Sequence, residues 1–374
     1  MNNILGIILT GGNSNNLGEL SINRSSAAMP IGGKYRAIDF VLSNMVNSGV
    51  VSVGVITQYN FRSLMDHLGS GKEWDLDRRT KGLFIFPPFI SPESNSWYRG
   101  SADALYNNLS FLRRSDEEYA IIAQGGNCIY KMDYTDMFDF HMQKDADITI
   151  VYREMTDFEP DDLKRLGIIQ KDSDERLTDF QEKPLHPLSN NASIGIYIMK
   201  KSLLISLLEE CVAHGDYDFV KDILIKKINS LKVYGYKFNG YWRSMCSVQL
   251  YYRTNMELLN PEIREELFKT GGKIFTKVKD ETPAKYNYEA EVTNSIVGDG
   301  CIIEGIVQNS ILFRGVTVNK GAVVKNSIIM QGSIIEDNAI LVNTILDKNV
   351  QVTQGKSLKG EDNWPIIVGR KAIV

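Results

Sequence analysis

The sequence has little of what marks a secreted or membrane-spanning protein. Its four cysteines, Cys128, Cys211, Cys246 and Cys301, lie far apart without a Cys-x-x-Cys spacing, so we expect buried free thiols in a reducing compartment. No stretch approaches the roughly 20 apolar residues that a membrane-spanning helix requires. The apolar run at residues 4–9 lacks a preceding basic residue and a small-residue cleavage pattern, which predicts a buried strand rather than a signal peptide. These absences predict a cytoplasmic protein with no membrane partner.

Histidine and excess charge are also scarce. The 374 residues include four histidines and carry a net charge of −4. No spacing of His with Cys or Asp fits a metal cluster. A nucleic-acid binder normally presents a basic face, so this balance argues against nucleic acid as a partner. A chain of this length is expected to form two domains rather than one core.

Up to about residue 240, short apolar runs alternate with helical patterns. We expect strands in ILGIILTGG, VVSVGVITQY, YAIIAQGG, DADITIVYRE and ASIGIYIMK, and helices in DALYNNLSFLRRSDEE and TDMFDFHMQK. The alternation predicts an α/β domain over residues 1–240, with a mostly parallel sheet covered by helices. Because ligands of such sheets bind at the carboxyl ends of the strands, the loops after Leu9, Gln58 and Ala123 are the expected site.

The C-terminal part has a different period. Asn-Ser-Ile occurs at 294–296, 309–311 and 326–328, and Asn-Thr-Ile at 343–345, with spacings of 15, 17 and 17 residues. A period of about 18 residues is three hexapeptides, one coil of a parallel β-helix whose apolar side chains stack inward. An ordinary β-sandwich with coincidental repeats is the alternative. The domains expected after residue 240 are a helical linker over 241–287 and a parallel β-helix over 288–374, ending in a cap formed by Lys356–Val374.

The first strand runs into LTGGNSNNL, which has the pattern of a phosphate-binding loop without its charge. Gly11 and Gly12 follow an apolar strand, as in loops whose backbone amides hold phosphate. Such loops usually go on to supply a cation, but here Asn13, Ser14, Asn15 and Asn16 follow. The two glycines are therefore interpreted as the remnant of a nucleotide loop.

Read together, these features resemble ADP-glucose pyrophosphorylase (glucose-1-phosphate adenylyltransferase) across essentially the whole chain. The matching segments are PIGGKYRAIDFVLSNMVNSGV, VGVITQY, WDLDRR, WYRGSADALYNN, IYKMDY, FQEKP, ASIGIYIM, DFVKDIL and FNGYW. The resemblance implies a Rossmann-like nucleotidyltransferase domain followed by a left-handed β-helix. It also implies a reaction in which glucose 1-phosphate attacks the α-phosphorus of ATP, giving ADP-glucose and pyrophosphate. Family members that carry it out need Mg²⁺ on two aspartates, and an arginine and a lysine on the triphosphate.

The sequence departs from the family pattern at all four of these positions. Asn16 stands for the arginine of the loop GGxGxRL, and Ser26 for the lysine of Ala-Lys-Pro-Ala. Asn127 replaces the aspartate of Gly-Asp-His, and Ser244 replaces that of Lys-Asp-Val-Gly. Losing one preorganised electrostatic group typically costs about 10² to 10³ in rate. We therefore expect no catalytic residue, no metal ligand and no cofactor in this chain.

The residues that the family uses for the sugar phosphate are present: Tyr98, Gly167, Glu182, Lys183 and Ser193. By resemblance, Lys183 pairs with the phosphate and Glu182 accepts hydrogen bonds from sugar hydroxyls. The alternatives are a solvated turn for the Glu-Lys-Pro run and a space-filling role for Ser193.

Lys34 and Arg36, in GGKYR, stand where the family places cations that bind phosphorylated effectors. Two cations after a flexible Gly-Gly suit a sugar bisphosphate. The alternative is a surface lysine and an arginine paired with Asp39.

The sequence thus predicts the regulatory, catalytically deficient subunit of glucose-1-phosphate adenylyltransferase in glycogen biosynthesis. Its expected partner is a catalytic sister subunit, in a hetero-oligomer with the stoichiometry of a tetramer, and Mg²⁺ is expected only in that sister. A sugar phosphate is the expected ligand or effector.

Three other interpretations were weighed. An active sugar-1-phosphate nucleotidyltransferase would need displaced metal ligands, for which Asp103, Asp133 and Asp218 are available, and Arg24 as a replacement cation. A purely structural scaffold subunit is the second alternative. The third, an acyltransferase, is disfavoured because those enzymes take a histidine base from the β-helix, and no histidine follows His214.

Overall fold

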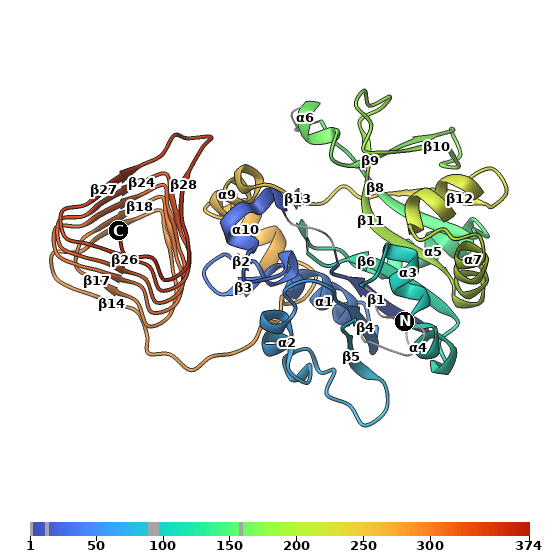
Figure 1. The fold of residues 1–374 in the computed structure, drawn as a ribbon, viewed down its shortest axis with the longest axis horizontal. Helices are drawn as coiled ribbons and strands as arrows, with labels where there is room; N and C mark the ends of the chain where they lie inside the picture. The colour runs from blue at the N-terminus through green and yellow to red at the C-terminus, as the bar shows by residue number, and fades with distance from the viewer. Residues whose placement is uncertain (1–2, 12–14, 89–96, 127, 157–159) are drawn as a thin grey trace.

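The computed structural model describes residues 3–11, 15–88, 97–126, 128–156 and 160–374. Of the residues named above, Gly12, Asn13, Ser14 and Asn127 lie outside these ranges. Figure 1 shows an α/β domain beside a stack of coils, with helices α9 (Val248–Glu257) and α10 (Pro261–Phe268) between them. No helix in the described part of the chain is long and apolar enough to cross a membrane.

A nine-stranded sheet forms the centre of the α/β domain, and it contains all five predicted strands. The main path runs β10-β9-β11-β6-β1-β4-β5, while β8 pairs with β11 and β12 pairs with β8. Strand β1 is parallel to β4 and β6, but β11 is antiparallel to β6, β8 and β9, so the sheet is mixed. The strands are β1 (Ile4–Leu9), β4 (Ser52–Ile56), β5 (Gly82–Phe86), β6 (Tyr119–Gln124), β8 (Ile148–Glu154), β9 (Gly167–Lys171), β10 (Leu177–Glu182), β11 (Asn191–Lys200) and β12 (Val233–Lys237).

Helices cover both faces of this sheet, because alternate residues of a strand point to opposite sides. Ile4 and Ile8 enter one core and Leu5 and Ile7 the other. The first core includes side chains of α1 (Ala37–Asn47), α2 (Arg62–Leu68) and α5 (Tyr134–Gln143); the second includes those of α3 (Ser101–Tyr106), α4 (Leu109–Arg114) and α7 (Lys201–Ala213).

The helix predicted over residues 103–118 is two helices, α3 and α4. The side-chain amides of Asn107 and Asn108 donate to the carbonyls of Asp103 and Ala104, at 2.8 Å each. Amide side chains compete in this way with the backbone bonds of a continuous helix. The prediction was right about helical structure and wrong about its continuity.

Short elements connect these parts and form the edges of the site described below. Strand β13 pairs antiparallel with β7, and Ser244 lies opposite Cys128. The elements are η1 (Asn15–Ser21), η2 (Ser26–Ala28), β2 (Pro30–Ile31), β3 (Tyr35–Arg36), η3 (Lys72–Trp74), β7 (Cys128–Tyr130), α6 (Pro160–Leu163), the π-helical η4 (Phe219–Leu224), α8 (Ile225–Lys227) and β13 (Trp242–Ser244).

The break between α9 and α10 falls just before Pro261. Pro261 is the first residue of α10, and the side chain of Asn260 accepts a hydrogen bond from the backbone of Glu262 at 2.9 Å. Proline is tolerated at a first helical position because its missing N–H has no partner there.

The C-terminal part is a parallel β-helix, in the arrangement of a left-handed one, made of three sheets with five strands each. Its last coil contains β27 and β28, and the backbones of Ala372 and Val374 pair with Gln351 and Thr353, so the predicted cap completes the stack. The first sheet is β14 (Lys285–Tyr286), β17 (Ile302–Ile303), β20 (Thr317–Val318), β23 (Ile334–Ile335) and β26 (Gln351–Val352). The second is β15 (Glu291–Thr293), β18 (Ile306–Gln308), β21 (Val323–Lys325), β24 (Ile340–Val342) and β27 (Ser357–Lys359). The third is β16 (Ile296–Val297), β19 (Ile311–Leu312), β22 (Ile328–Ile329), β25 (Thr344–Leu346) and β28 (Ile366–Val368).

The repeated Asn-Ser-Ile motif marks one corner of each coil. Its asparagines have positive φ, from 42° to 50°, a conformation that asparagine tolerates better than most residues. The hydroxyl of each serine accepts the backbone N–H of the next coil: Ser295 from Ser310, Ser310 from Ser327 and Ser327 from Thr344, at 3.1 Å each. Stacking of identical corners therefore fixes the register.

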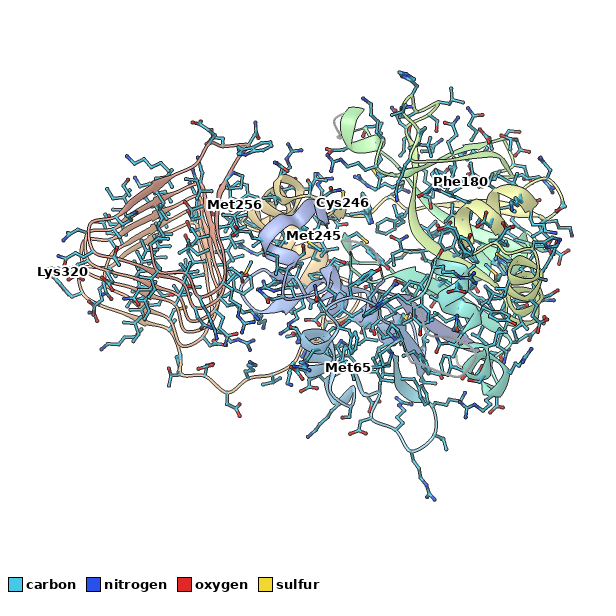
Figure 2. All side chains as sticks on the ribbon, in the orientation of Figure 1. Met65, Phe180, Met245, Cys246, Met256 and Lys320 are labelled. Atoms are coloured by element: carbon cyan, nitrogen blue, oxygen red, sulfur yellow. The ribbon has the colours of Figure 1, made fainter. Side chains whose placement is uncertain are left out.

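The isoleucines of the motif face the α/β domain rather than the interior of the β-helix, which corrects the expectation that they stack inward. Ile311, Ile328 and Ile345 share an apolar cluster with Leu17 and Met245. The interior is filled instead by the residues that follow them, such as Leu312, Ile329 and Leu346. Met245 and Met256 lie between the two bodies in Figure 2.

Candidate functional site

A cavity of about 720 Å³ lies where β1, β4 and β6 end. Its walls include Thr10, Gly11, Gln58 and Gln124, which belong to the loops that the strand pattern indicated. These loops meet because the carboxyl ends of parallel strands reach the same edge of the sheet.

The part of the cavity formed by the N-terminal loops, η2, β7 and β13 is called the loop half, and the described residues that line it carry no charge. Three of the residues that replace family charges line it: Asn16 on η1, Ser26 on η2 and Ser244 on β13. Ser26 and Ser244 are buried, and Asn16 is exposed. A Cβ on Gly126 would come within 2.5 Å of the Ser26 hydroxyl, so the serine fills the space against this loop.

We call the part formed by β9, β10 and β11 the sugar half. Six charged side chains occur among the described lining residues, and none of them belongs to the elements of the loop half. Glu182 ends β10, and Lys183 follows it with a φ of 50°. The ammonium of Lys183 lies 3.3 Å from a carboxylate oxygen of Glu182 and is 65% exposed, so it can reach a phosphate from solvent. The six are Arg99, Lys164, Arg165, Glu182, Lys183 and Asp218.

Gly167 makes room for this pair. It starts β9 opposite Glu182, and a Cβ there would lie 2.5 Å from the ring of Phe180 and 3.3 Å from a carboxylate oxygen of Glu182. Ser193, on β11, pairs with Gly167 across the sheet, and its hydroxyl accepts the backbone N–H of Gly195 at 3.4 Å. The structure thus brings together the residues that the Glu-Lys-Pro and Ala-Ser-Ile-Gly matches indicated.

Tyr98 lines the cavity close to the first loops. Its backbone carbonyl accepts a hydrogen bond from the Gln58 amide at 2.8 Å, and its hydroxyl accepts one from Asn108 at 3.3 Å. Burial raises the pKa of its phenol, so it is a neutral hydrogen-bonding group at physiological pH.

Three cations of the cavity lining were not predicted. Arg99 follows Tyr98, and Asp103 holds its guanidinium at 3.0 Å, which raises the Arg99 pKa. Lys164 and Arg165 precede Gly167 on the segment that leads into β9. The sequence signal for these cations was their position beside Tyr98 and Gly167, which match the family's sugar-phosphate residues.

The carboxylates considered as displaced metal ligands are engaged elsewhere. Asp103 binds Arg99, and Asp133 caps α5 by accepting the backbone N–H of Thr135 at 2.9 Å; neither lines the cavity. Asp218 lines it, but one of its oxygens accepts two backbone N–H groups of η4.

The family's divalent metal does not fit the loop half as described. Mg²⁺ in such sites is held by carboxylates, and the described lining residues of this half offer hydroxyls, amides and thiols, including Cys128 and Cys246. In the described ranges, no three His, Cys, Asp or Glu side chains converge as a metal site.

Of the predicted effector residues, Lys34 lies on the turn between β2 and β3, and Arg36 is the last residue of β3. Lys34 is exposed, with its ammonium 5.1 Å from the centre of the Tyr35 ring. The Arg36 guanidinium donates to the carbonyl and hydroxyl of Ser63, at 2.7 and 3.1 Å, while its backbone N–H bonds Asp39.

Arg36 belongs to a group of cations between the α/β domain and the β-helix, which we call the basic seam. Burial lowers the pKa of Arg36 to about 10, and repulsion from Arg24 and Arg314 contributes. Burial likewise lowers the pKa of Lys348 to about 7, assisted by Arg36, Arg24 and Arg370. The seam consists of Arg24, Arg36, Lys279, Arg314, Lys348 and Arg370. Such crowding of partly buried positive charge favours binding of an anion.

Comparison with known proteins agrees with this architecture. Residues 5–261 match the model of the nucleotidyl transferase family, and residues 281–364 match a GlmU-like C-terminal hexapeptide model. The glucose-1-phosphate adenylyltransferase of Clostridium perfringens is 43% identical over 86% of this chain and 82% of its own length. That of Pseudothermotoga lettingae is 40% identical over 86% and 76%, and that of Geobacillus stearothermophilus 38% identical over 85% and 82%, respectively. The chain belongs to the glucose-1-phosphate adenylyltransferase family.

Proposed function

We propose that this chain is the regulatory, catalytically deficient subunit of a glucose-1-phosphate adenylyltransferase in glycogen biosynthesis. It would assemble with a catalytic sister chain, as a cytoplasmic heterotetramer, and change the turnover or the effector response of that chain. Mg²⁺ and the transfer of the adenylyl group then belong to the sister subunit.

The observation that carries the proposal is the distribution of charge in the cavity. All six charged lining residues described lie outside the elements of the loop half, whereas Ser26 and Ser244 belong to them. Transfer of a phosphoryl group depends on positioning and on stabilising the charge that develops on phosphate oxygens. Without cations and metal carboxylates at the loop half, ATP would lack that stabilisation.

The chain's own residues support binding of a sugar phosphate. Lys183 presents an ammonium for the phosphate, and Glu182 presents a carboxylate for sugar hydroxyls. Gly167 gives this pair its space. A bound sugar phosphate would therefore be held and oriented, but not converted.

Regulation is proposed to act through the basic seam. Arg36 contributes to it and Lys34 lies two residues away, which supports their assignment to a phosphorylated effector. Because the seam joins the two bodies, a ligand there would contact the α/β domain and the β-helix together.

The test is an assay of ADP-glucose and pyrophosphate formation with three samples: this chain alone, the sister chain alone and their equimolar mixture. We expect little or no product from this chain and a higher rate or a changed effector dependence in the mixture. Turnover by this chain alone at the rate of the sister would refute the proposal, as would a mixture that equals the sum of its parts with the same effector response.

A further inference from the structure

One buried ion pair connects the α/β domain to the β-helix. The guanidinium of Arg24 lies 2.5 Å from a carboxylate oxygen of Asp347, and both side chains are nearly inaccessible, at 3% and 1% exposed. The same guanidinium also approaches the sulfur of Met330 at 3.3 Å. Arg24 precedes η2, and Asp347 directly follows β25.

This pair lies inside the basic seam. Repulsion from the Arg24 guanidinium contributes to the lowered pKa values of both Arg36 and Lys348, so the three cations interact electrostatically. Asp347 opposes that effect on Lys348, the next residue, whose backbone N–H it accepts at 2.7 Å. One seam cation is therefore neutralised by a carboxylate of the chain itself.

We propose that Asp347 is a tethered competitor of the anion that binds the basic seam. Without a ligand, its carboxylate occupies Arg24; a bound phosphate takes over Arg24, and Asp347 turns to the neighbouring Lys348. The inference rests on the proposed function, because it assumes that the seam binds a phosphorylated effector.

The exchange has a consequence for the cavity. Ser26, on the cavity wall, lies two residues after Arg24, and the hydroxyl of the intervening Ser25 is buried without a hydrogen-bond partner. A change of partner at Arg24 would therefore move the segment that places Ser26 in the wall of the loop half. The ion pair is positioned to couple the seam to the cavity.

The test is calorimetric titration of the full chain with fructose 1,6-bisphosphate, in a Lys183→Ala background that removes the phosphate contact of the cavity. We expect Asp347→Asn to lower the dissociation constant about tenfold. The control is Glu281→Gln, which removes a carboxylate facing Arg314 but not one paired with Arg24. It should change the constant less than threefold. The double variant Arg24→Gln/Asp347→Asn should not show this gain in affinity.

Equal or weaker binding by a folded Asp347→Asn chain, or an equal gain in Glu281→Gln, would overturn the inference while leaving the effector site in place. Absence of binding in every folded variant would overturn both, whereas the regulatory role is judged separately by the mixing assay. Should Asp347→Asn fail to fold, hydrogen exchange on the Lys183→Ala chain decides. The bisphosphate should speed exchange of the Lys348 amide, and unchanged or slower exchange would contradict the proposal.

Discussion

The two halves of the cavity differ in chemistry more than in shape. The sugar half is built on β9, β10 and β11 and keeps paired charges at Glu182 and Lys183. The loop half is built on the N-terminal loops, η2, β7 and β13, and its described residues have hydroxyls and amides where the family pattern has charges. Buried strands set the shape of both halves, while a few residues at loop tips set the chemistry. A fold can therefore persist while the chemistry of one part of its site changes.

Restoring the charged residues of the loop half should have the largest effect, and that effect should be on the rate of ADP-glucose formation. We expect Asn127→Asp/Ser244→Asp, combined with Asn16→Arg and Ser26→Lys, to raise ADP-glucose formation at least about 10²-fold, since each such group contributes strongly to rate. The measurement is pyrophosphate release by the purified chain with Mg²⁺. The matched control is Asn229→Asp/Ser230→Asp, which makes the same two acidic replacements at exposed positions after α8.

A restored chain no more active than this control would show that the loop half has lost more than its charges. An unmodified chain already as active as the restored one would show that those positions are not required.

Removing the ammonium of Lys183 should have the second largest effect, and that effect should be on the affinity of the sugar half for a sugar phosphate. Lys183→Ala should weaken binding of glucose 1-phosphate about 10- to 100-fold, because a hydrogen bond to a charged group contributes about 1.5–3 kcal/mol. Calorimetry measures the change. Lys221→Ala, on η4 but outside the cavity lining, is the control and should bind as the unmodified chain does. If neither the unmodified chain nor the control binds the sugar phosphate, the scaffold interpretation gains support.

Crowding Gly167 should have an intermediate effect. Gly167→Ala places a methyl group against Phe180 and Glu182, and overpacking of this kind typically costs about 1–3 kcal/mol. We expect a lower melting temperature and several-fold weaker binding of glucose 1-phosphate. Adding Phe180→Leu should recover part of both, because it frees the space; no recovery would mean that the ring is not the obstacle.

The smallest effect expected is the pH dependence of the basic seam. The Lys348 pKa is about 7 in the folded chain against 10.5 for an ordinary lysine, so the unfolded chain binds more protons between these values. Stability should therefore rise with pH across that window. A bound phosphate favours the protonated lysine, so its affinity should fall about threefold from pH 7 to pH 8.5. Titrations at both pH values measure this, and in Lys348→Met the dependence should vanish.

Much of the fold followed from the sequence. Apolar runs predicted the five strands, and the Asn-Ser-Ile repeat predicted the β-helix, because both patterns reflect burial with a regular period. The antiparallel placement of β11 did not follow, since strand direction depends on tertiary contacts. The break at Asn107 did not follow either, because hydrophobic periodicity does not register local side-chain amide bonds.

The site was predictable where a residue adjoined a matched motif and not elsewhere. Glu182 and Lys183 were found through the Glu-Lys-Pro run. Lys348 and Arg370 were missed, because they reach the seam only through the packing of distant segments. Arg99 was missed although it lies within the matched segment WYRGSADALYNN. The partner of Arg24 lies 323 residues away and has no local signal.

The contact between the β-helix and the α/β domain bears on how a neighbouring subunit could act. Ile311, Ile328 and Ile345 belong to one apolar cluster with Leu17, which lies beside the first loop, and with Met245, the residue after Ser244. Close-packed interiors transmit displacement rather than absorbing it. If another chain tilted the coils slightly, the segments that contain Leu17 and Met245 would therefore shift together. The loop half would then change shape without that chain reaching the cavity.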